Sequence, residues 1–174
     1  MQRKFRLTCV TLLVGFLTMA QHPDIVEYKD ISVNGIDVRS TETQLIEAFG
    51  PPISITSPNY ECGGLSEAWN DIDVTLYRWE GIEFHMVDGI VEVGTIDFTK
   101  ANPKIKTKQL TFDKSTTLDE LQKAFPNSFQ IWKERNRKYG SKILSVWPSE
   151  FSDSEFHIII EKGNIVTFTL YHPC

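Results

Sequence analysis

An internal repeat with an offset of 76 residues is the feature that most constrains how this chain folds. Residues 40–50 align with residues 116–126. Both segments open with a capping box, in which a Thr hydroxyl and a Gln or Glu side chain satisfy free amides at a helix start. Apolar residues then recur at the spacing of one helix face, as Leu45, Ala48 and Phe49 and again as Leu121, Ala124 and Phe125. The pattern predicts two equivalent helices, which begin after Thr41 and Thr117.

Strand signals follow each helix in the same order. Residues 83–87 align with residues 155–159, since both segments begin Glu-Phe-His. Each segment is followed by a Gly-containing turn and another apolar run, which together indicate a β-hairpin. A strand that ends in Trp precedes each hairpin, and one more strand is expected directly after each helix. The expected strands are therefore 53–56, 74–79, 83–87 and 90–98 in the first copy, and 129–132, 143–147, 155–159 and 165–171 in the second.

The fold class that follows is α+β, built from two tandem units. Each unit is expected to have a short leading strand and one helix packed on about four antiparallel strands, and the two sheets can join. The first unit spans 21–99 and the second 100–174, with the basic, Pro-containing segment 100–108 at the boundary. Gly50-Pro51-Pro52 and Pro126-Asn127 are expected to end the two helices, because these residues disfavour helix continuation.

Residues 1–20 have the pattern of a secretory signal peptide. Three basic residues precede the apolar run 7–20, which is shorter than the roughly 20 residues that span a bilayer. Thr18 and Ala20 provide small residues before a cleavage site at Gln21. The alternative is an uncleaved membrane anchor. We expect a periplasmic or secreted protein without a stable membrane anchor after cleavage.

Cleavage would leave two cysteines, Cys62 and Cys174. In an oxidising compartment an even pair favours one disulfide, and the loop it would close contributes about 4 kcal/mol in the chain-entropy model. The alternative is two unrelated thiols. Without Cys-x-x-Cys spacing the pair does not form a zinc site. His85 and His157 occupy equivalent positions, which duplication explains more simply than metal binding, so we expect neither a metal nor a cofactor.

Charge is distributed unevenly along the chain. Residues 21–99 contain three basic and fifteen acidic residues, a net charge of −12, whereas residues 100–174 contain twelve basic and eight acidic residues, a net charge of +4. A strongly acidic half attracts basic partners and repels nucleic acid. Surplus acid is also common on soluble exported domains, so this signal alone leaves both interpretations open. On the first interpretation, the charge predicts a protein partner with a basic surface and no nucleic acid.

The repeated Thr-x-x-Gln/Glu-Leu helix, ending in Phe-Gly-Pro in the first copy, resembles the β-lactamase-inhibitor-protein architecture. The resemblance covers most of residues 21–174 in pattern. It implies two units whose sheets join, with helices on one side, and an exported, non-enzymatic protein that binds another protein. A single unit is also similar to the small outer-membrane assembly lipoproteins of the SmpA/OmlA kind. Periplasmic immunity proteins are similar in size and are also found in the periplasm.

Alternation within the strands separates candidate binding residues from core residues. Glu83 and His85 are expected to point away from the helices, as are Glu155 and His157. Alternation does not fix which face Trp79 takes, because the opposite side of its strand is equally apolar. Trp, Tyr, His and Glu together have the composition of a binding hot spot. The candidate partner-binding residues are Tyr77, Trp79, Glu83, His85, Trp147, Glu155 and His157.

No catalytic motif is present in the sequence, which contains neither Gly-x-Ser-x-Gly nor His-Glu-x-x-His. We therefore expect a non-enzymatic, exported protein-binding module that inhibits or neutralises a secreted enzyme or toxin. One alternative is an envelope scaffold or assembly factor. Another is a hydrolase with acid chemistry at a carboxylate pair such as Glu80 and Glu83.

Overall fold

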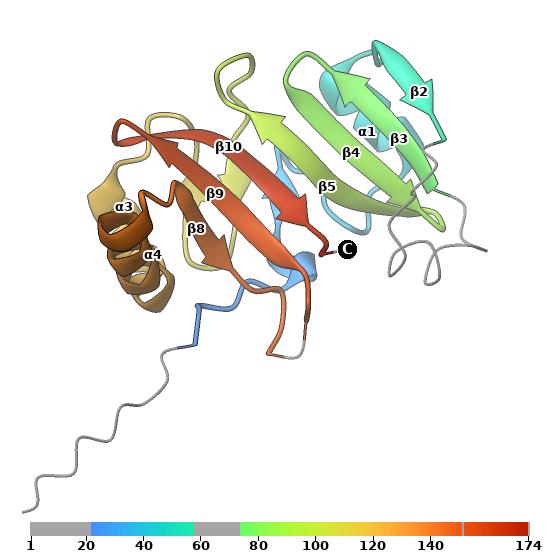
Figure 1. Ribbon diagram of the computed structural model, residues 1–174. Helices are drawn as coiled ribbons and strands as arrows, with labels where there is room; N and C mark the ends of the chain where they lie inside the picture. The colour runs from blue at the N-terminus through green and yellow to red at the C-terminus, as the bar shows by residue number, and fades with distance from the viewer. Residues whose placement is uncertain (1–21, 58–73, 151, 174) are drawn as a thin grey trace, which may run out of the picture.

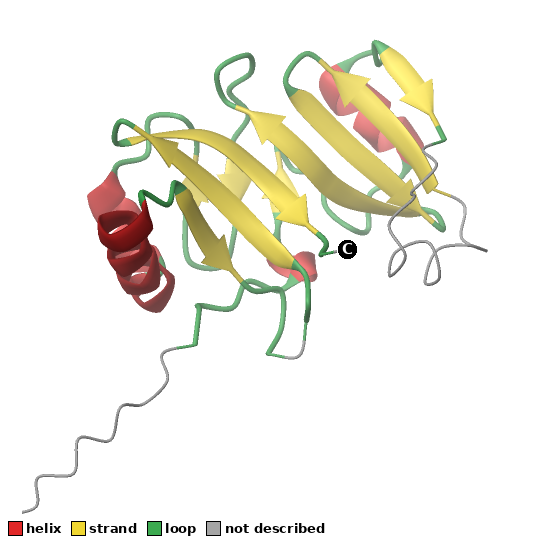
Figure 2. Cartoon of the chain, viewed as in Figure 1, coloured by secondary structure: helices red, strands yellow, loops and turns green. Residues whose placement is uncertain are grey.

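The computed structural model describes residues 22–57, 74–150 and 152–173, and these residues form an α+β fold (Figure 1). Three α-helices and two antiparallel sheets make up the described part of the chain. Figure 2 shows that the helices lie behind the larger sheet and beside its edge, so that one sheet face is turned towards the viewer. The predicted α+β class is confirmed.

The larger sheet has seven strands in the order β2-β3-β4-β5-β10-β9-β8. Every neighbouring pair is antiparallel. The central pair, β5 and β10, joins the two hairpins into one sheet (Figure 1). The strands are β2 (Ser54–Thr56), β3 (Val74–Trp79), β4 (Ile82–Val87), β5 (Ile90–Asp97), β8 (Ile143–Val146), β9 (Glu155–Glu161) and β10 (Asn164–Tyr171).

Both hairpins turn within two residues that have positive φ. Asp88 and Gly89 have φ angles of 50° and 78°, and Lys162 and Gly163 have φ angles of 50° and 82°. Two successive left-handed residues match the right-handed twist of the flanking strands, which is why Gly is favoured at the second position. This turn geometry fixes the strand register, so that Val87 lies opposite Ile90.

The smaller sheet has the order β1-β6-β7 and comprises β1 (Ser32–Val33), β6 (Ile105–Lys106) and β7 (Thr111–Phe112). Its apolar residues point into the core, where Val33 and Ile105 are fully buried and Phe112 is nearly so. The ring of Phe112 contacts the ring of Phe168 on β10 at a centroid distance of 5.6 Å. The smaller sheet therefore packs behind the centre of the larger one.

Helices α1 (Glu42–Phe49) and α3 (Leu118–Ala124) begin as the repeat predicts. Both capping boxes are present, with the N-cap Thr hydroxyl accepting from the third backbone amide and the Gln44 or Glu120 side chain accepting from the N-cap amide. The next residue in each helix, Leu45 or Leu121, is fully buried. Capping and burial of one apolar stripe together explain why these short segments are helical.

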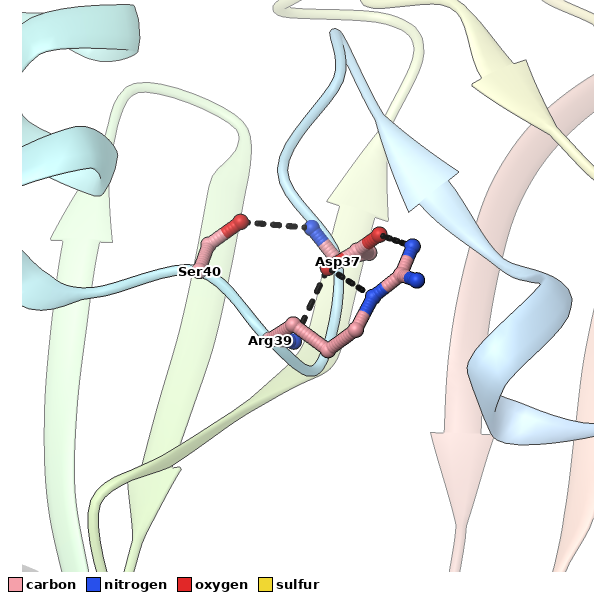
Figure 3. A network of polar contacts seen from close by, with 3 residues as sticks. All are labelled: Asp37, Arg39 and Ser40. Atoms are coloured by element: carbon pink, nitrogen blue, oxygen red, sulfur yellow. Dashed lines mark hydrogen bonds and ion pairs between the residues drawn. The ribbon is translucent and has the colours of Figure 1, made fainter.

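A tight polar turn precedes each capped helix at the same offset. In the first, shown in Figure 3, the Asp37 amide donates to the Ser40 hydroxyl, and the Arg39 amide donates to the Asp37 carboxylate at 2.8 Å. In the second, the Asp113 amide donates to the Thr116 hydroxyl and the Ser115 amide donates to the Asp113 carboxylate, also at 2.8 Å. These bonds set the direction from which the chain enters each helix.

The second half departs from the prediction after Phe125. The strand expected at 129–132 is wrong, because these residues lie within helix α4 (Pro126–Tyr139). Pro126 occupies the first helical turn, where its missing amide is no loss, so it starts a helix rather than only ending one. Phe129 and Trp132 then lie one turn apart and their rings contact each other at 5.0 Å. The second half thus has two α-helices, and three of its strands are in the larger sheet.

Residues before β1 are fixed to the second half over a long sequence separation. The Ser128 amide donates to the Asp24 carboxylate at 2.8 Å, and the Asp24 amide donates to the Ser128 hydroxyl at 2.9 Å. The Val26 amide donates to the Trp147 carbonyl, and the Trp147 amide donates to the Asp24 carbonyl. The 3-10 helix η1 (Tyr28–Asp30) follows.

The signal peptide expected at 1–20 and both cysteines, Cys62 and Cys174, lie outside the described residues. Export and the disulfide therefore stay predictions. Within 22–57, 74–150 and 152–173, every helix is too short or too polar to cross a bilayer.

The capping boxes generate a stability prediction. We expect Thr41→Ala and Thr117→Ala each to lower the free energy of unfolding by about 1 kcal/mol, because each leaves a helix-start amide without its acceptor. Urea unfolding of residues 21–174 measures this. Thr43→Ala is the matched control within α1, since Thr43 is exposed and helix propensity favours Ala. Equal losses in Thr43→Ala and Thr41→Ala would contradict the capping role.

Candidate functional site

The two faces of the larger sheet differ in what covers them. On one face, ring contacts join β4, β9 and β10 to the elements behind the sheet: Phe84 to Phe49 of α1, Phe156 to Tyr28 of η1, and Phe168 to Phe112 of β7. This is the core face, and it carries the largest fully buried side chains of the sheet, including Phe84 and Phe156. The helices and the smaller sheet thus pack against this face.

The opposite face, here named the open face, is turned towards the viewer in Figure 1, and no helix of the described residues covers it there. At β3 this side carries Val74 and Leu76, which are buried, so the open face extends from β4 to β8. Polar and aromatic side chains predominate on it. By alternation and register, its residues include Glu83, His85, Glu92, Thr95, Ser145, Glu155, His157, Thr169 and Tyr171.

Tyr77 and Trp79 do not lie on the open face, which corrects their placement among the candidate binding residues. The Tyr77 side chain is 5% exposed, and its hydroxyl donates to the Glu42 carboxylate of α1 at 2.8 Å. The Trp79 indole N–H donates to the Gly50 carbonyl at the end of α1 at 2.9 Å. Both side chains therefore attach α1 to the sheet.

A Glu-His pair occupies the same position in each half. The distance from His85 Nε2 to Glu83 Oε1 is 3.6 Å, and that from His157 Nε2 to Glu155 Oε2 is 3.0 Å. Arg78 on β3 also contacts Glu83, with Nε at 2.8 Å from Oε2. Each carboxylate lies beside its histidine because the two residues are two positions apart on one strand.

Both carboxylates are held in the ionised form. The hydrogen bond with His85 lowers the pKa of Glu83, burial opposes this, and Arg78 lowers the pKa further. Burial acts to raise the pKa of Glu155, but hydrogen bonds with Ser145 and His157 outweigh it and keep the pKa below its ordinary value. The open face consequently carries at least these two negative charges at neutral pH.

A second group of polar residues, here named the central cluster, lies where β5 and β10 separate. The two strands pair only over Thr95–Asp97 and Thr167–Thr169. Past the paired segment, the Ser154 hydroxyl lies 2.6 Å from His172 Nδ1, within hydrogen-bonding distance. The central cluster comprises Tyr28, His85, Glu92, Ser154 and His172.

Burial controls the ionisation of the central cluster. It raises the pKa of Glu92, while the nearby His85 acts in the opposite direction. One carboxylate oxygen of Glu92, Oε2, has no hydrogen-bond partner among the described residues, so the charged form lacks compensation there. Burial also lowers the pKa of His172, and the neighbouring His85 adds to this effect. Burial raises the pKa of Tyr28.

Trp147 lies at the outer edge of the open face rather than in its centre. Its ring contacts His22 edge-on at 6.2 Å. Together with Glu155 on β9 and Arg135 on α4, it lines a pocket of about 250 Å³. The backbone bonds of Trp147 to Asp24 and Val26 hold this edge in place.

Large apolar side chains are exposed across the open face. Ile90 is 50% exposed, Ile143 is 38% exposed and Tyr171 is 46% exposed. The Tyr171 ring stacks on the His157 ring at a centroid distance of 4.8 Å and an interplanar angle of 16°. Exposed aromatic and aliphatic groups among charged residues are typical of protein-binding surfaces.

The structure brings together five of the seven candidate binding residues on the open face or at its edge, namely Glu83, His85, Trp147, Glu155 and His157. The sequence reasoning missed Glu92 and Tyr171. Glu92 could have been found, because the two-residue turn at Asp88-Gly89 places it opposite His85. No sequence signal brings Ser154 and His172 to the centre, since both lie outside strands.

Across residues 22–57, 74–150 and 152–173, no group of three or more His, Cys, Asp or Glu side chains is arranged to hold a metal ion. Comparison of the chain with protein-family models, with curated proteins and with solved structures finds no match.

The raised pKa of Glu92 generates a pH prediction. In the unfolded chain a Glu ionises near pH 4.3, whereas folded Glu92 keeps its proton to a higher pH. The folded state therefore binds more protons in that window, and stability falls as pH rises through it. We expect Glu92→Gln to stabilise the protein relative to wild type at neutral pH, and this advantage to vanish at about pH 3, where unfolded Glu is also protonated.

Urea unfolding at a series of pH values measures this difference. The exposed Glu80→Gln variant removes the same charge from a solvated position and is the matched control. A stability difference between Glu92→Gln and wild type that does not change with pH would show that burial of the Glu92 charge does not destabilise the fold.

Proposed function

We propose that this chain is an exported protein-binding module that acts through the open face, and that it inhibits or neutralises a secreted enzyme or toxin. The observation that carries the proposal is the one-sided packing of the seven-stranded sheet. The helices and the smaller sheet attach to the core face through Tyr77, Phe84, Phe156 and Phe168, while the other face exposes Tyr171 and Ile143. A sheet face with exposed aromatic, aliphatic and charged groups fits a protein partner better than a small molecule.

The proposed architecture is two diverged copies of one unit, with residues 21–99 and 100–174 as the copies. The capping boxes and the preceding Asp turns recur with the same hydrogen bonds at an offset of 76 residues. The Glu-His pairs occupy corresponding strands, β4 and β9. These recurrences support duplication, and the resemblance to the β-lactamase-inhibitor-protein architecture leads to the same class of function.

The charge of the first half supports a partner with a basic surface. Its three basic residues all pair with acids of the same half: Lys29 with Glu27, Arg39 with Asp37, and Arg78 with Glu83. The acidic surplus of residues 21–99 is therefore not neutralised by cations of that half. Complementary charge raises the association rate and makes binding sensitive to salt.

Site-specific cross-linking tests whether the open face binds a protein. A photoreactive phenylalanine analogue at position 171 is expected to cross-link one envelope or secreted protein in producing cells. The same analogue at position 111 is the control, because Thr111 is exposed on the smaller sheet behind the core. Equal products from both positions, or none from position 171, would argue against the open face.

With the cross-linked protein purified, Tyr171→Ala and His157→Ala are each expected to weaken binding roughly tenfold or more, because the exposed Tyr171 ring is held in place by stacking on the largely buried His157 ring. Calorimetry gives the Kd, and Thr111→Ala is expected to leave it unchanged. Loss of the partner's own activity at equimolar addition identifies an inhibitor. Full partner activity in the complex would instead favour an envelope scaffold.

A further inference from the structure

The second half of α4 is a surface that neither the fold nor the open face explains. Helix α4 has 14 residues, but only Ser128 and Phe129 are buried, and both lie near its start. All residues from 133 to 139 are exposed. This segment, here named the basic end of α4, therefore contributes little apolar burial to the core.

Four cations are concentrated on the basic end of α4. Lys133, Arg135, Arg137 and Lys138 make no ion pair with any described residue, and the one acid of the segment, Glu134, accepts a hydrogen bond from Gln130. In the first half, by contrast, every cation is paired with an acid of that half. Unpaired, solvated cations on one helix end make a local positive field.

An exposed aromatic ring accompanies these charges. Tyr139 is 72% exposed, and the Lys138 Nζ lies 4.9 Å above the centre of its ring. Because the Tyr139 ring is exposed, it buries little apolar area and does not stabilise the fold. An amphipathic ring beside several cations is typical of segments that lie at the boundary between water and lipid head groups.

We infer that the basic end of α4 docks the protein on a membrane surface that bears anionic lipid head groups. Charge complementarity favours phosphate head groups, with the cations against the phosphates and Tyr139 at the level of the head groups. The remainder of the exposed helix is polar, so contact is electrostatic and reversible rather than insertion into the apolar layer. The acidic first half is repelled by the same surface, which orients the molecule with that half turned away.

This inference is independent of the proposed function, because Lys133, Arg137, Lys138 and Tyr139 lie outside the pocket at the edge of the open face, which Arg135 alone of this segment lines. Each cation near an anionic surface contributes roughly fivefold to partitioning. The triple variant Lys133→Gln, Arg137→Gln, Lys138→Gln is therefore expected to reduce binding about a hundredfold at low salt. Arg135 is kept in this variant because it lines the pocket beside Trp147.

The experiment is co-sedimentation of residues 21–174 with vesicles of phosphatidylcholine that contain phosphatidylglycerol, and with vesicles of phosphatidylcholine alone. We expect the chain to bind only the anionic vesicles and to be released as salt rises to roughly 0.5 M. Tyr139→Ala is expected to weaken binding by a few fold. The matched control, Lys104→Gln, Lys106→Gln, Lys108→Gln, removes three exposed charges from around β6 and is expected to bind nearly as wild type.

Three outcomes would overturn the inference. The first is equal binding to both kinds of vesicle, and the second is equal loss in the two triple variants. The third is association of the chain with itself in place of vesicle binding, detected by analytical ultracentrifugation and abolished by the α4 triple variant. That result would assign the basic end of α4 to the acidic half of a second copy. Circular dichroism verifies that both variants keep the wild-type fold.

Discussion

The pairing of β5 with β10 is the interaction on which the rest of the structure depends. It consists of three residue pairs, in which Thr95–Asp97 lie opposite Thr167–Thr169, and the hydroxyls of Thr95 and Thr169 are 2.9 Å apart. These pairs convert two separate hairpins into one seven-stranded sheet. Behind them, Ile96 and Phe168 are almost fully buried, and Phe112 of the smaller sheet packs against Phe168. Because only three pairs join the two strands, this packing of the smaller sheet adds to what holds the centre together.

The same short pairing creates the polar centre of the molecule. Once β5 and β10 separate, the chain brings Glu92, His172 and Ser154 together instead of a continued ladder of backbone bonds. Buried ionisable groups without full hydrogen bonding destabilise a fold, so the charged form of Glu92 lowers stability at the centre of the sheet. The two outer hairpins are packed conventionally, with capped helices behind the sheet.

Most of the fold could be predicted from local sequence patterns. Capping boxes, helix-face spacing and two-residue turns are local signals, and α1, α3 and both hairpins begin and end close to their expected positions. Helix α4 was missed because Pro126 both ends one helix and starts the next, and a four-residue window could not separate strand from helix. The face taken by Tyr77 was not readable, since Val74 and Leu76 on the other side are equally apolar; its bond to Glu42 is a tertiary contact. The pairing of β5 with β10 joins distant segments and has no local signature.

The hydrogen bonds between residues 24–26 and the second half impose an order on folding. The mutual hydrogen bonds of Asp24 and Ser128 span 104 residues, and those of Asp24 and Val26 reach as far as Trp147. A chain that emerges amino end first cannot form these bonds until residues near 147 have also emerged. Residues 24–26 are therefore among the last to reach their final contacts, since such long loops close slowly. Residues 24–26 thus join the fold only after the segment up to Trp147 is available to bind them.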